Sequence, residues 1–418
     1  MTTRRRWIET VAFASAGTLG LHAAPAPVPL LQLGSEALEA SQFKALQGKR
    51  VGLLTHQAGL NRRGRSTVEL LKGAPGVKLA ALFAPEHGLR GDIPAGTEFG
   101  DTLDVRTGLP LFSLYGPGPV RKPTPKMLRG LDVLVYDMQD VGCRSYTFIS
   151  TMGLSMESCA ESGVEFMVLD RPNPIGGVRV EGPGLDPRYR SLVSQWNIPY
   201  AYGLTCGELA RMIVGERWIK PGLKLTVVPM KGWKRAMVWK DTGLRWVPTS
   251  PKIPTPGSAT HYTALGLLGE IAKGSGLHTG GLFDRPFEWV SAAWMDAARV
   301  AASMNALKLK TVRFRHGEAS HSGRPYGVVF AEYLDAARAP LVAQTFYYLD
   351  AIKKVHGKNL GMEWGVREPG SGLFDKVAGG TQLRRDLAAG RPARGIIDSW
   401  SGVERDFRTR RKPYLMYW

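Results

Sequence analysis

Residues 130–142 read GLDVLVYDMQDVG, and this stretch decides the expected fold. It contains an uninterrupted apolar run from Val133 to Tyr136, which turns polar at Asp137. A continuous apolar run, in place of alternating apolar and polar residues, is typical of a strand buried on both faces of a parallel sheet. In open α/β folds, ligands bind just beyond the carboxyl ends of such strands. The polar residues after this strand are therefore candidates for a functional site.

Four more apolar runs predict strands, at residues 51–54, 77–84, 111–114 and 164–169. Helical patterns separate them: Ser66 followed by Glu69 is a capping box, and residues 146–163 have apolar positions near helical spacing. This alternation predicts an α/β protein with a Rossmann-like, doubly wound parallel sheet over residues 35–215. We expect residues 216–418 to form a second, smaller α+β domain.

The first 27 residues have the composition of an export signal, with a basic start, a mildly apolar stretch and then small residues and prolines. Adjacent arginines followed by Trp7 and Ile8 resemble a twin-arginine signal, whose substrates cross the membrane already folded. The apolar stretch Val11–Leu21 is too short to span a bilayer well. A noncleaved tether and a wrongly chosen start site are the alternatives. We expect an exported protein, periplasmic or extracellular, with no transmembrane span after signal removal.

The net charge of +19, from 55 Lys and Arg against 36 Asp and Glu, favours anionic partners. The basic residues are scattered and match no nucleic-acid-binding motif, so we expect an anionic cell-envelope polymer and not nucleic acid. A generally arginine-rich proteome would explain the same charge. The three cysteines have no CxxC spacing, which argues against a zinc cluster or a disulfide framework and favours buried, small apolar side chains.

Several common catalytic motifs are missing from the sequence. The first strand is not followed by GxGxxG, and the phosphate-binding GxxxxGK[ST], the serine-hydrolase GxSxG and the zinc-binding HExxH are absent. We therefore expect no cofactor. His56, His87 and Asp140 have the chemistry to bind a metal together, but no local spacing demands it. No metal is expected, although a metal-dependent hydrolase stays an alternative.

Polar side chains follow each predicted strand and should converge on one edge of the sheet. They are His56 after the first strand, Glu86 and His87 after the second, Asp137, Gln139, Asp140 and Arg144 after the fourth, and Asp170, Arg171 and Asn173 after the fifth. Each has a structural alternative: a helix cap, a core histidine, a loop held by a carboxylate, or an arginine paired within the site. Thr205 with Glu208 three residues later predicts a helix cap and not a catalytic pair.

Carboxylates at a sheet edge suit glycoside cleavage. One carboxylic acid protonates the leaving oxygen, and a second carboxylate or the substrate itself attacks or stabilises the anomeric carbon. The acid needs a raised pKa, which burial or a like-charged neighbour provides. Glu86 follows an apolar strand and lies near other carboxylates, so it fits the role of the acid.

Five phrases carry a resemblance to a known family. They are LFAPEHGLRGDIPAG (82–96), TGLPLFSLYG (107–116), LDVLVYDMQDVGCRSYTFISTM (131–152), VLDRPNPIGG (168–177) and YGLTCGELA (202–210). Their order and spacing resemble the exo-β-N-acetylmuramidase (NamZ/YbbC-like) family over roughly residues 36–215, with weaker similarity up to the terminal RRKPYLMYW. The resemblance implies a Rossmann-like domain and a smaller C-terminal domain with the site between them. It also implies release of N-acetylmuramic acid from the non-reducing ends of peptidoglycan fragments during cell-wall turnover.

The resemblance implies a catalytic role for Glu86, whereas the roles of the other residues are inferred from their positions and chemistry. Glu86 is the catalytic residue of the PEHG phrase, and Asp140 and Glu181 are candidates for a second catalytic carboxylate. The expected substrate-binding residues are His56, His87, Arg90, Arg144, Tyr146, Asp170 and Asn173. Muramic acid carries a lactyl carboxylate, and we expect Arg90 or Arg144 to hold it with paired hydrogen bonds.

One stretch departs from the family pattern. Relatives carry FEGTN followed by SEGRGT after the proline-rich loop, whereas this chain has LLGEIAKGSGLHTGGLFDRPFEW at residues 267–289. Glu270 is a candidate replacement for the first glutamate, and His278 occupies the glycine-rich segment. The departure leaves a non-catalytic muropeptide-binding or glycan-binding protein as an alternative function.

Overall fold

The computed structural model describes residues 31–118, 121–272, 274–358, 360 and 373–418. The predicted export signal, residues 1–27, lies outside these described residues. Residues from Leu31 onward form one compact unit. No helix among the described residues is long and apolar enough to cross a membrane.

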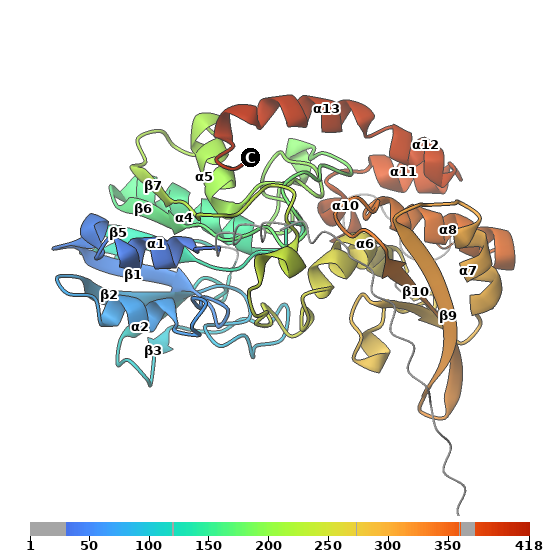
Figure 1. Ribbon diagram of the computed structural model, residues 1–418, viewed down its shortest axis with the longest axis horizontal. Coiled ribbons are helices and arrows are strands. Elements are labelled where there is room, and N and C mark those ends of the chain that lie inside the picture. The colour runs from blue at the N-terminus through green and yellow to red at the C-terminus, as the bar shows by residue number, and fades with distance from the viewer. Residues whose placement is uncertain (1–30, 119–120, 273, 359, 361–372) are drawn as a thin grey trace, which may run out of the picture. The chain divides into compact units, whose positions relative to one another are not determined.

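A seven-stranded sheet organises the first half of this unit, with the strand order β3-β4-β2-β1-β5-β6-β7 (Figure 1). The strands are β1 Arg50–Thr55, β2 Lys78–Ala84, β3 Thr102–Leu103, β4 Pro110–Ser113, β5 Val133–Asp137, β6 Glu165–Leu169 and β7 Leu225–Val228. Every neighbouring pair is parallel except β3 with β4, which is antiparallel. The predicted α/β class is confirmed.

Helices cover both faces of this sheet because successive strand residues point to opposite sides. Val133 and Val135 of β5 pack with α1 and α2, whereas Leu134 and Tyr136 pack with α3, α4 and α5. The helices are α1 Gly34–Ala40, α2 Thr67–Lys72, α3 Pro125–Leu128, α4 Phe148–Ser162 and α5 Cys206–Gly215. With both faces covered, the continuous apolar runs of the strands are all buried, as a doubly wound sheet requires.

The two predicted capping boxes are confirmed. Ser66 accepts a hydrogen bond from the backbone of Glu69 at the start of α2, and the Glu69 carboxylate accepts one from the backbone of Ser66 at 2.8 Å. Thr205 and Glu208 exchange the same pair of bonds at the start of α5, at 3.2 and 3.1 Å. Glu208 also pairs with Arg235. These contacts give Thr205 and Glu208 a structural role.

The second half contains a three-stranded antiparallel sheet in the order β8-β10-β9. Its strands are β8 Trp289–Ala292, β9 Val312–His321 and β10 Arg324–Tyr333. The helices are α6 Ser258–Ile271, α7 Ala297–Asn305, α8 Ala343–His356, α10 Leu373–Ala378, α11 Gln382–Ala388, α12 Ala393–Asp398 and α13 Ser401–Arg410. Short 3₁₀ helices lie at Lys44–Leu46, Pro187–Tyr189, Trp239–Thr242, Gly281–Phe283 and Lys412–Tyr414.

The large sheet extends beyond residue 215, where we expected the first domain to end. β7 adds to the edge of β6 and is only half-buried, so it is part of the first sheet. The last residues of the chain also return to this half: α13 leads back to α5 (Figure 1), and Arg211 of α5 donates to the backbone of Tyr414. The two halves are therefore interleaved at the C-terminus.

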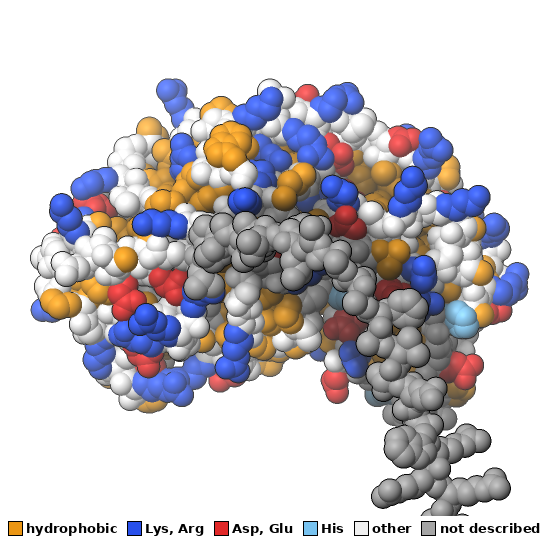
Figure 2. Space-filling model, in the orientation of Figure 1, with side chains coloured by type: hydrophobic (Ala, Val, Ile, Leu, Met, Phe, Trp, Pro, Cys, Tyr) orange, Lys and Arg blue, Asp and Glu red, His pale blue; other side chains and the backbone are white. Residues whose placement is uncertain are grey.

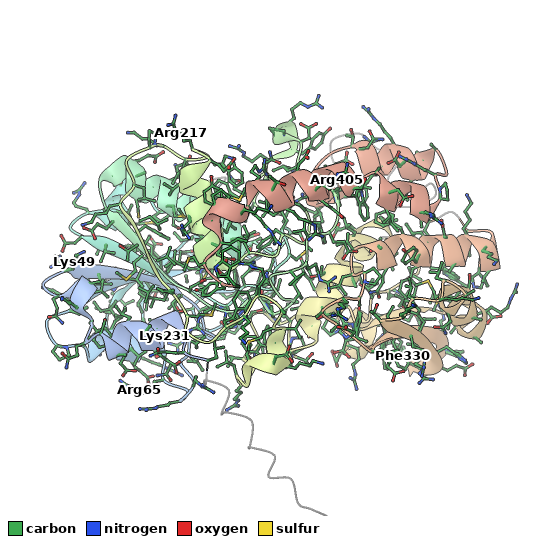
Figure 3. All side chains as sticks on the ribbon, turned by 45° about the horizontal axis from the view of Figure 1, so that its top comes forward. Lys49, Arg65, Arg217, Lys231, Phe330 and Arg405 are labelled. Carbon is green, nitrogen blue, oxygen red and sulfur yellow. The ribbon has the colours of Figure 1, made fainter. Side chains whose placement is uncertain are left out.

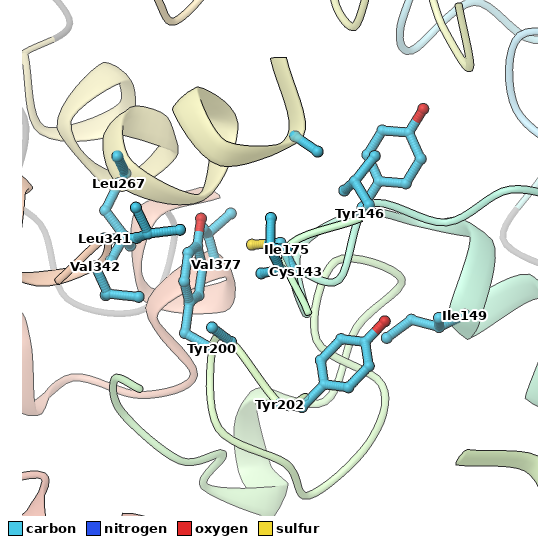
Figure 4. Packing of buried hydrophobic residues seen from close by; sticks show 14 of the residues in the cluster. Cys143, Tyr146, Ile149, Ile175, Tyr200, Tyr202, Leu267, Leu341, Val342 and Val377 are labelled. Atoms are coloured by element: carbon cyan, nitrogen blue, oxygen red, sulfur yellow. The ribbon is translucent and has the colours of Figure 1, made fainter. Parts of the chain in front are cut away.

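One large buried cluster joins the two halves. Figure 4 shows Tyr200 and Tyr202, from the loop before α5, in this cluster with Leu267 of α6 and Val342 ahead of α8. The three cysteines are free and buried, as predicted from their spacing. On the face seen in Figure 2, Lys and Arg side chains are spread over the surface with acidic side chains among them.

Candidate active site

Glu86 lies just beyond the carboxyl end of β2, where Pro85 ends the strand. Both oxygens of its half-buried carboxylate are held. Oε1 accepts the backbone N–H of Gly96 at 2.9 Å, and Oε2 accepts the hydroxyl of Thr147 at 2.9 Å. Thr147 immediately precedes α4, so the carboxylate is fixed between the ends of two elements of the large sheet.

Three tyrosines surround Glu86. Tyr115 follows β4, Tyr146 precedes α4, and Tyr262 lies on α6. Burial raises the pKa of each phenol, and the negative charge of Glu86 raises it further. The tyrosines therefore stay neutral and can donate hydrogen bonds to a sugar. Tyr262 reaches this site from the second half of the chain, where its hydroxyl lies 2.9 Å from Ser145 Oγ.

His87 adopts a left-handed backbone conformation with φ of +73°. Such a conformation is unfavourable for a non-glycine residue, by on the order of 1 kcal/mol, and is common at functional sites. Its Nδ1 lies 2.8 Å from the backbone oxygen of Ile93, so Nδ1 carries the proton and donates. Nε2 is then an acceptor, and it has no hydrogen-bond partner among the described residues.

His56 lies beyond β1 and is buried beside these groups. Its Nε2 accepts the backbone N–H of Gln139 at 2.9 Å, and its ring packs edge-on against Phe148 at 5.0 Å. Burial lowers the pKa of His56 to about 3, with the charge of Arg171 adding to the effect. Among the described residues no group of three or more His, Cys, Asp or Glu could hold a metal ion.

Asp140 is 5% exposed and lies beneath the site. Its Oδ2 accepts the backbone N–H of Gly142 at 2.7 Å and the hydroxyl of Tyr202 at 2.5 Å, whereas Oδ1 has no hydrogen bond of good geometry. Burial raises the pKa of Asp140 to about 6. The charges of both Asp140 and Glu86 act on Tyr146, whose hydroxyl is 2.8 Å from Thr249 in the proline-rich loop.

Arg144 is not available to bind a substrate carboxylate. It is fully buried, and its guanidinium donates to Ser194 Oγ and to four backbone oxygens, at Pro183, Ile198, Val377 and Ala378. It has no ion pair with Asp140. We assign Arg144 a structural role in place of the expected lactyl contact.

Asp170 and Asn173 are also committed to structural contacts. The carboxylate of Asp170 is fully buried and accepts from the backbones of Arg171 and Gly207 and from the hydroxyls of Thr205 and Tyr417. The Asn173 amide donates to Leu204 and accepts from Ile175, which holds the turn. Both oxygens of Asp170 have hydrogen-bond partners and Asn173 is 4% exposed, so we assign both residues structural contacts, and their expected role in substrate binding stays a prediction.

Arg90 lines a pocket together with His56, whereas Glu181 lies at the segment before α8. Arg90 pairs with Asp104 at 2.8 Å on the surface of the loop after β2. The Glu181 carboxylate accepts the backbone N–H groups of Leu341 and Ala343 at 2.9 Å and pairs with Arg179. These bonds stabilise the segment before α8, so we assign Glu181 a structural role in place of the second catalytic carboxylate.

Glu270 and His278, the two candidates in the stretch that departs from the family pattern, have the following positions. Glu270 lies in the last turn of α6. His278 is half-buried and exchanges two backbone hydrogen bonds with Ser291, and its ring lies edge-on to that of Tyr326 at 6.0 Å.

Tyr115, Thr147, Thr249 and Tyr262 are not among the site residues predicted from the sequence. Tyr115 and Thr147 lie within phrases that carry the family resemblance, so that similarity was a signal for them. Thr249 belongs to a proline-rich loop and Tyr262 to a largely buried helix, and neither has a local pattern that indicates a site.

Two family models match the chain: the N-terminal domain of exo-β-N-acetylmuramidase NamZ over residues 51–257, and its C-terminal domain over residues 260–417. The chain belongs to the NamZ family. The two NamZ domains meet at the start of α6 and not at residue 215, which agrees with the inclusion of β7 in the first sheet.

Individual relatives resemble the chain over most of its length. It is 39% identical over 394 residues to the peptidoglycan β-N-acetylmuramidase NamZ of Bacillus subtilis, covering 93% of this chain and 92% of that protein. Two crystal structures of DUF1343 family proteins from Bacteroides fragilis are similar, with TM-scores of 0.84 and 0.71 and identities of 41% and 26%. Each comparison covers 93% of this chain and 99% of the other.

Proposed function

We propose that this protein is an exo-acting glycoside hydrolase that releases N-acetylmuramic acid from the non-reducing ends of peptidoglycan fragments. Membership of the NamZ family and the 39% identity to a peptidoglycan β-N-acetylmuramidase support the reaction. The structural observation that carries the proposal is the Glu86 carboxylate, which is fixed at the carboxyl edge of the large sheet among neutral hydroxyl donors.

In this mechanism Glu86 protonates the glycosidic oxygen as the bond to the leaving sugar breaks. Thr147 and the backbone of Gly96 hold the two carboxylate oxygens, so the proton is delivered from a fixed position. Tyr115, Tyr146 and Tyr262 surround that position with neutral hydroxyls, of which those of Tyr146 and Tyr262 already contact Thr249 and Ser145. The Nε2 atom of His87 can accept a hydrogen bond from a hydroxyl of the same sugar.

The second role, attack on the anomeric carbon, does not suit Asp140. A nucleophile must reach the sugar, and Asp140 is buried with Oδ2 held by Tyr202 and Gly142. We assign Asp140 a supporting role, in which its charge acts on Tyr146. The acetamido oxygen of the substrate itself can supply the attack, as it does in substrate-assisted glycosidases.

The twin-arginine-like start of the chain supports export to the periplasm or the cell exterior, where peptidoglycan fragments occur. Cell fractionation, with and without replacement of Arg4, Arg5 and Arg6 by lysine, tests this location. Retention of the triple variant in the cytoplasm is the expected result. Unchanged distribution would count against a signal of this kind.

The decisive test of the activity is hydrolysis of a MurNAc–GlcNAc disaccharide by the chain from residue 28 onward. Glu86→Gln should reduce turnover by at least ~10²-fold, the lower end of what general acid catalysis contributes. Glu161→Gln is a matched control, because Glu161 is an exposed carboxylate on α4 paired only with Lys122. No sugar release by the wild-type protein at pH 5–8, or normal turnover by Glu86→Gln, would refute the proposal.

A further inference from the structure

A cavity lies at the carboxyl edge of the large sheet, apart from Glu86. It has a volume of about 370 Å³ and is lined by residues that follow β1, β5 and β6, among them Leu60, Gln139 and Arg171. Neither Glu86 nor any group that contacts it lines this cavity. Strand order reverses between β1 and β5, and such a switch point is where open α/β sheets bind ligands.

The side chain of Gln139 lines this cavity, and its buried oxygen has no hydrogen-bond partner. The side chain is 2% exposed, and its Nε2 donates to the backbone oxygens of Asp140 and Pro172, both at 2.9 Å. Because both partners are acceptors, the amide cannot be flipped, and Oε1 is left without a hydrogen bond. A buried carbonyl without a partner costs on the order of 1–3 kcal/mol. A hydroxyl or amide N–H of a ligand would remove that cost.

The charge around the cavity is positive. Four arginines line it, and no described carboxylate does. Arg171 is neutralised by Asp137 at 2.5 Å, and Arg62 donates to the backbone of Leu31. The guanidinium groups of Arg63 and Arg245 are exposed and have no hydrogen bond or ion pair among the described residues. Two unpaired guanidinium groups favour a carboxylate, which each can bind with two parallel hydrogen bonds.

The remaining residues that line the cavity limit the size of a ligand and favour a ligand with an apolar part. Trp239, Leu244 and Leu33 supply apolar walls. The side-chain oxygen of Asn61 accepts from the backbones of Arg63 and Arg65, so its amide nitrogen is left as a further donor. The cavity is at the small end of the range for ligand pockets, which suits a sugar acid or a dipeptide.

We propose that this cavity binds a small carboxylate ligand that also carries a hydroxyl or amide N–H. The carboxylate pairs with Arg63 and Arg245, and the donor reaches Gln139 Oε1. The choice of ligand rests on the proposed function, which offers two sources of this chemistry: released N-acetylmuramic acid, and the acidic peptide attached to the lactyl group of muramic acid in peptidoglycan.

Titration calorimetry tests the site with two probes, N-acetylmuramic acid and L-alanyl-D-glutamate, at low ionic strength. The double variant Arg63→Ala/Arg245→Ala and the single variant Gln139→Leu should each bind one of the probes at least tenfold more weakly. The matched control is Arg313→Ala/Arg405→Ala, which removes two exposed, unpaired arginines elsewhere; Arg405 lies on α13 (Figure 3). The control should bind like the wild type.

The identity of the affected probe distinguishes the free product from the peptide. Binding of neither probe to the wild type, or equal binding by the wild type and the double variant, would overturn the proposal. Hydrolysis of the MurNAc–GlcNAc disaccharide is measured in parallel and should be unchanged in the double variant. Failure of the glycosidase proposal would appear as absent hydrolysis by the wild type, independently of the binding result.

Discussion

The hydroxyl of Thr147 donates a 2.9 Å hydrogen bond to Glu86, and this bond connects the start of α4 to the end of β2. Because the two residues are 61 positions apart, the bond forms only when the parallel sheet is complete. It fixes the carboxylate on the side where Tyr146 and Tyr262 also lie.

Thr147→Val should therefore impair catalysis without unfolding the protein. Valine has a similar shape but lacks the hydroxyl, and a hydrogen bond to a charged group contributes ~1.5–3 kcal/mol. We expect kcat to fall roughly 10- to 100-fold, with a smaller change in KM, because the bond positions the acid. Thr102→Val, at an exposed site on β3, is the control. Equal kinetics of the wild type and Thr147→Val would show that the bond has no positioning role.

Asp140 should make stability depend on pH. Burial raises its pKa from 3.8 to about 6, so the folded protein holds this proton more tightly than the unfolded chain does. The stability that results is present below about pH 4 and is lost as the pH rises through about 6. Asp140→Asn stays neutral throughout, so its free energy of unfolding relative to the wild type should rise over this range, by on the order of 1–3 kcal/mol.

Urea denaturation at pH 4.5 and pH 7.5 measures this difference. Asp170 also has a pKa raised by burial to about 6, but it is present in both proteins and cancels in the comparison. A difference between Asp140→Asn and the wild type that is the same at both pH values would show that Asp140 does not titrate in this range.

Arg144→Met should destabilise the protein and leave substrate affinity unchanged. Methionine fills part of the space but removes every donor to the surrounding backbone oxygens, and each unpaired buried acceptor costs ~1–3 kcal/mol. We expect a loss of several kcal/mol in the free energy of unfolding. For the protein that remains folded, KM for a MurNAc–GlcNAc substrate should match the wild type. A large rise in KM at normal stability would instead restore Arg144 as a substrate ligand.

Tyr417→Phe tests how the end of the chain is fixed. The Tyr417 hydroxyl donates to Asp170 at 2.6 Å and accepts from the backbone of Met230 at 3.0 Å. Removal of the hydroxyl leaves a buried carboxylate short of one donor, so the free energy of unfolding should fall by ~1–3 kcal/mol. Thermal unfolding measures the loss, and Tyr189→Phe, in an exposed 3₁₀ helix, is the control. An unchanged melting temperature in Tyr417→Phe would contradict the structural role of Asp170.

The strands of the large sheet could be predicted because each buried strand is a continuous apolar run with turns at both ends. β7 was assigned to the wrong half because its four residues are half-buried and follow a complete helix, where the chain pattern resembles a domain boundary. The periodicity of apolar residues indicates how far a strand is buried, but it does not indicate which sheet the strand joins.

The candidate site shows a different limit of prediction from sequence. A polar residue after a strand faces a ligand or is satisfied inside the protein, and its partners decide which. Arg144 bonds to Ala378, 234 positions away, and Asp170 bonds to Tyr417, 247 positions away. No local pattern contains such partners. Glu86 was found because a phrase specific to the family surrounds it, and its catalytic role stays a prediction.

Tyr262 belongs to the segment matched by the second NamZ domain, yet the charge of Glu86, which belongs to the first, acts on its hydroxyl. The C-terminal half can therefore diverge and reshape the wall that meets the sugar while the acid stays the same. Relatives that share the PEHG phrase need not accept the same glycans. A swap of α6 between two of them would transfer the preference for a glycan without changing the reaction that is catalysed.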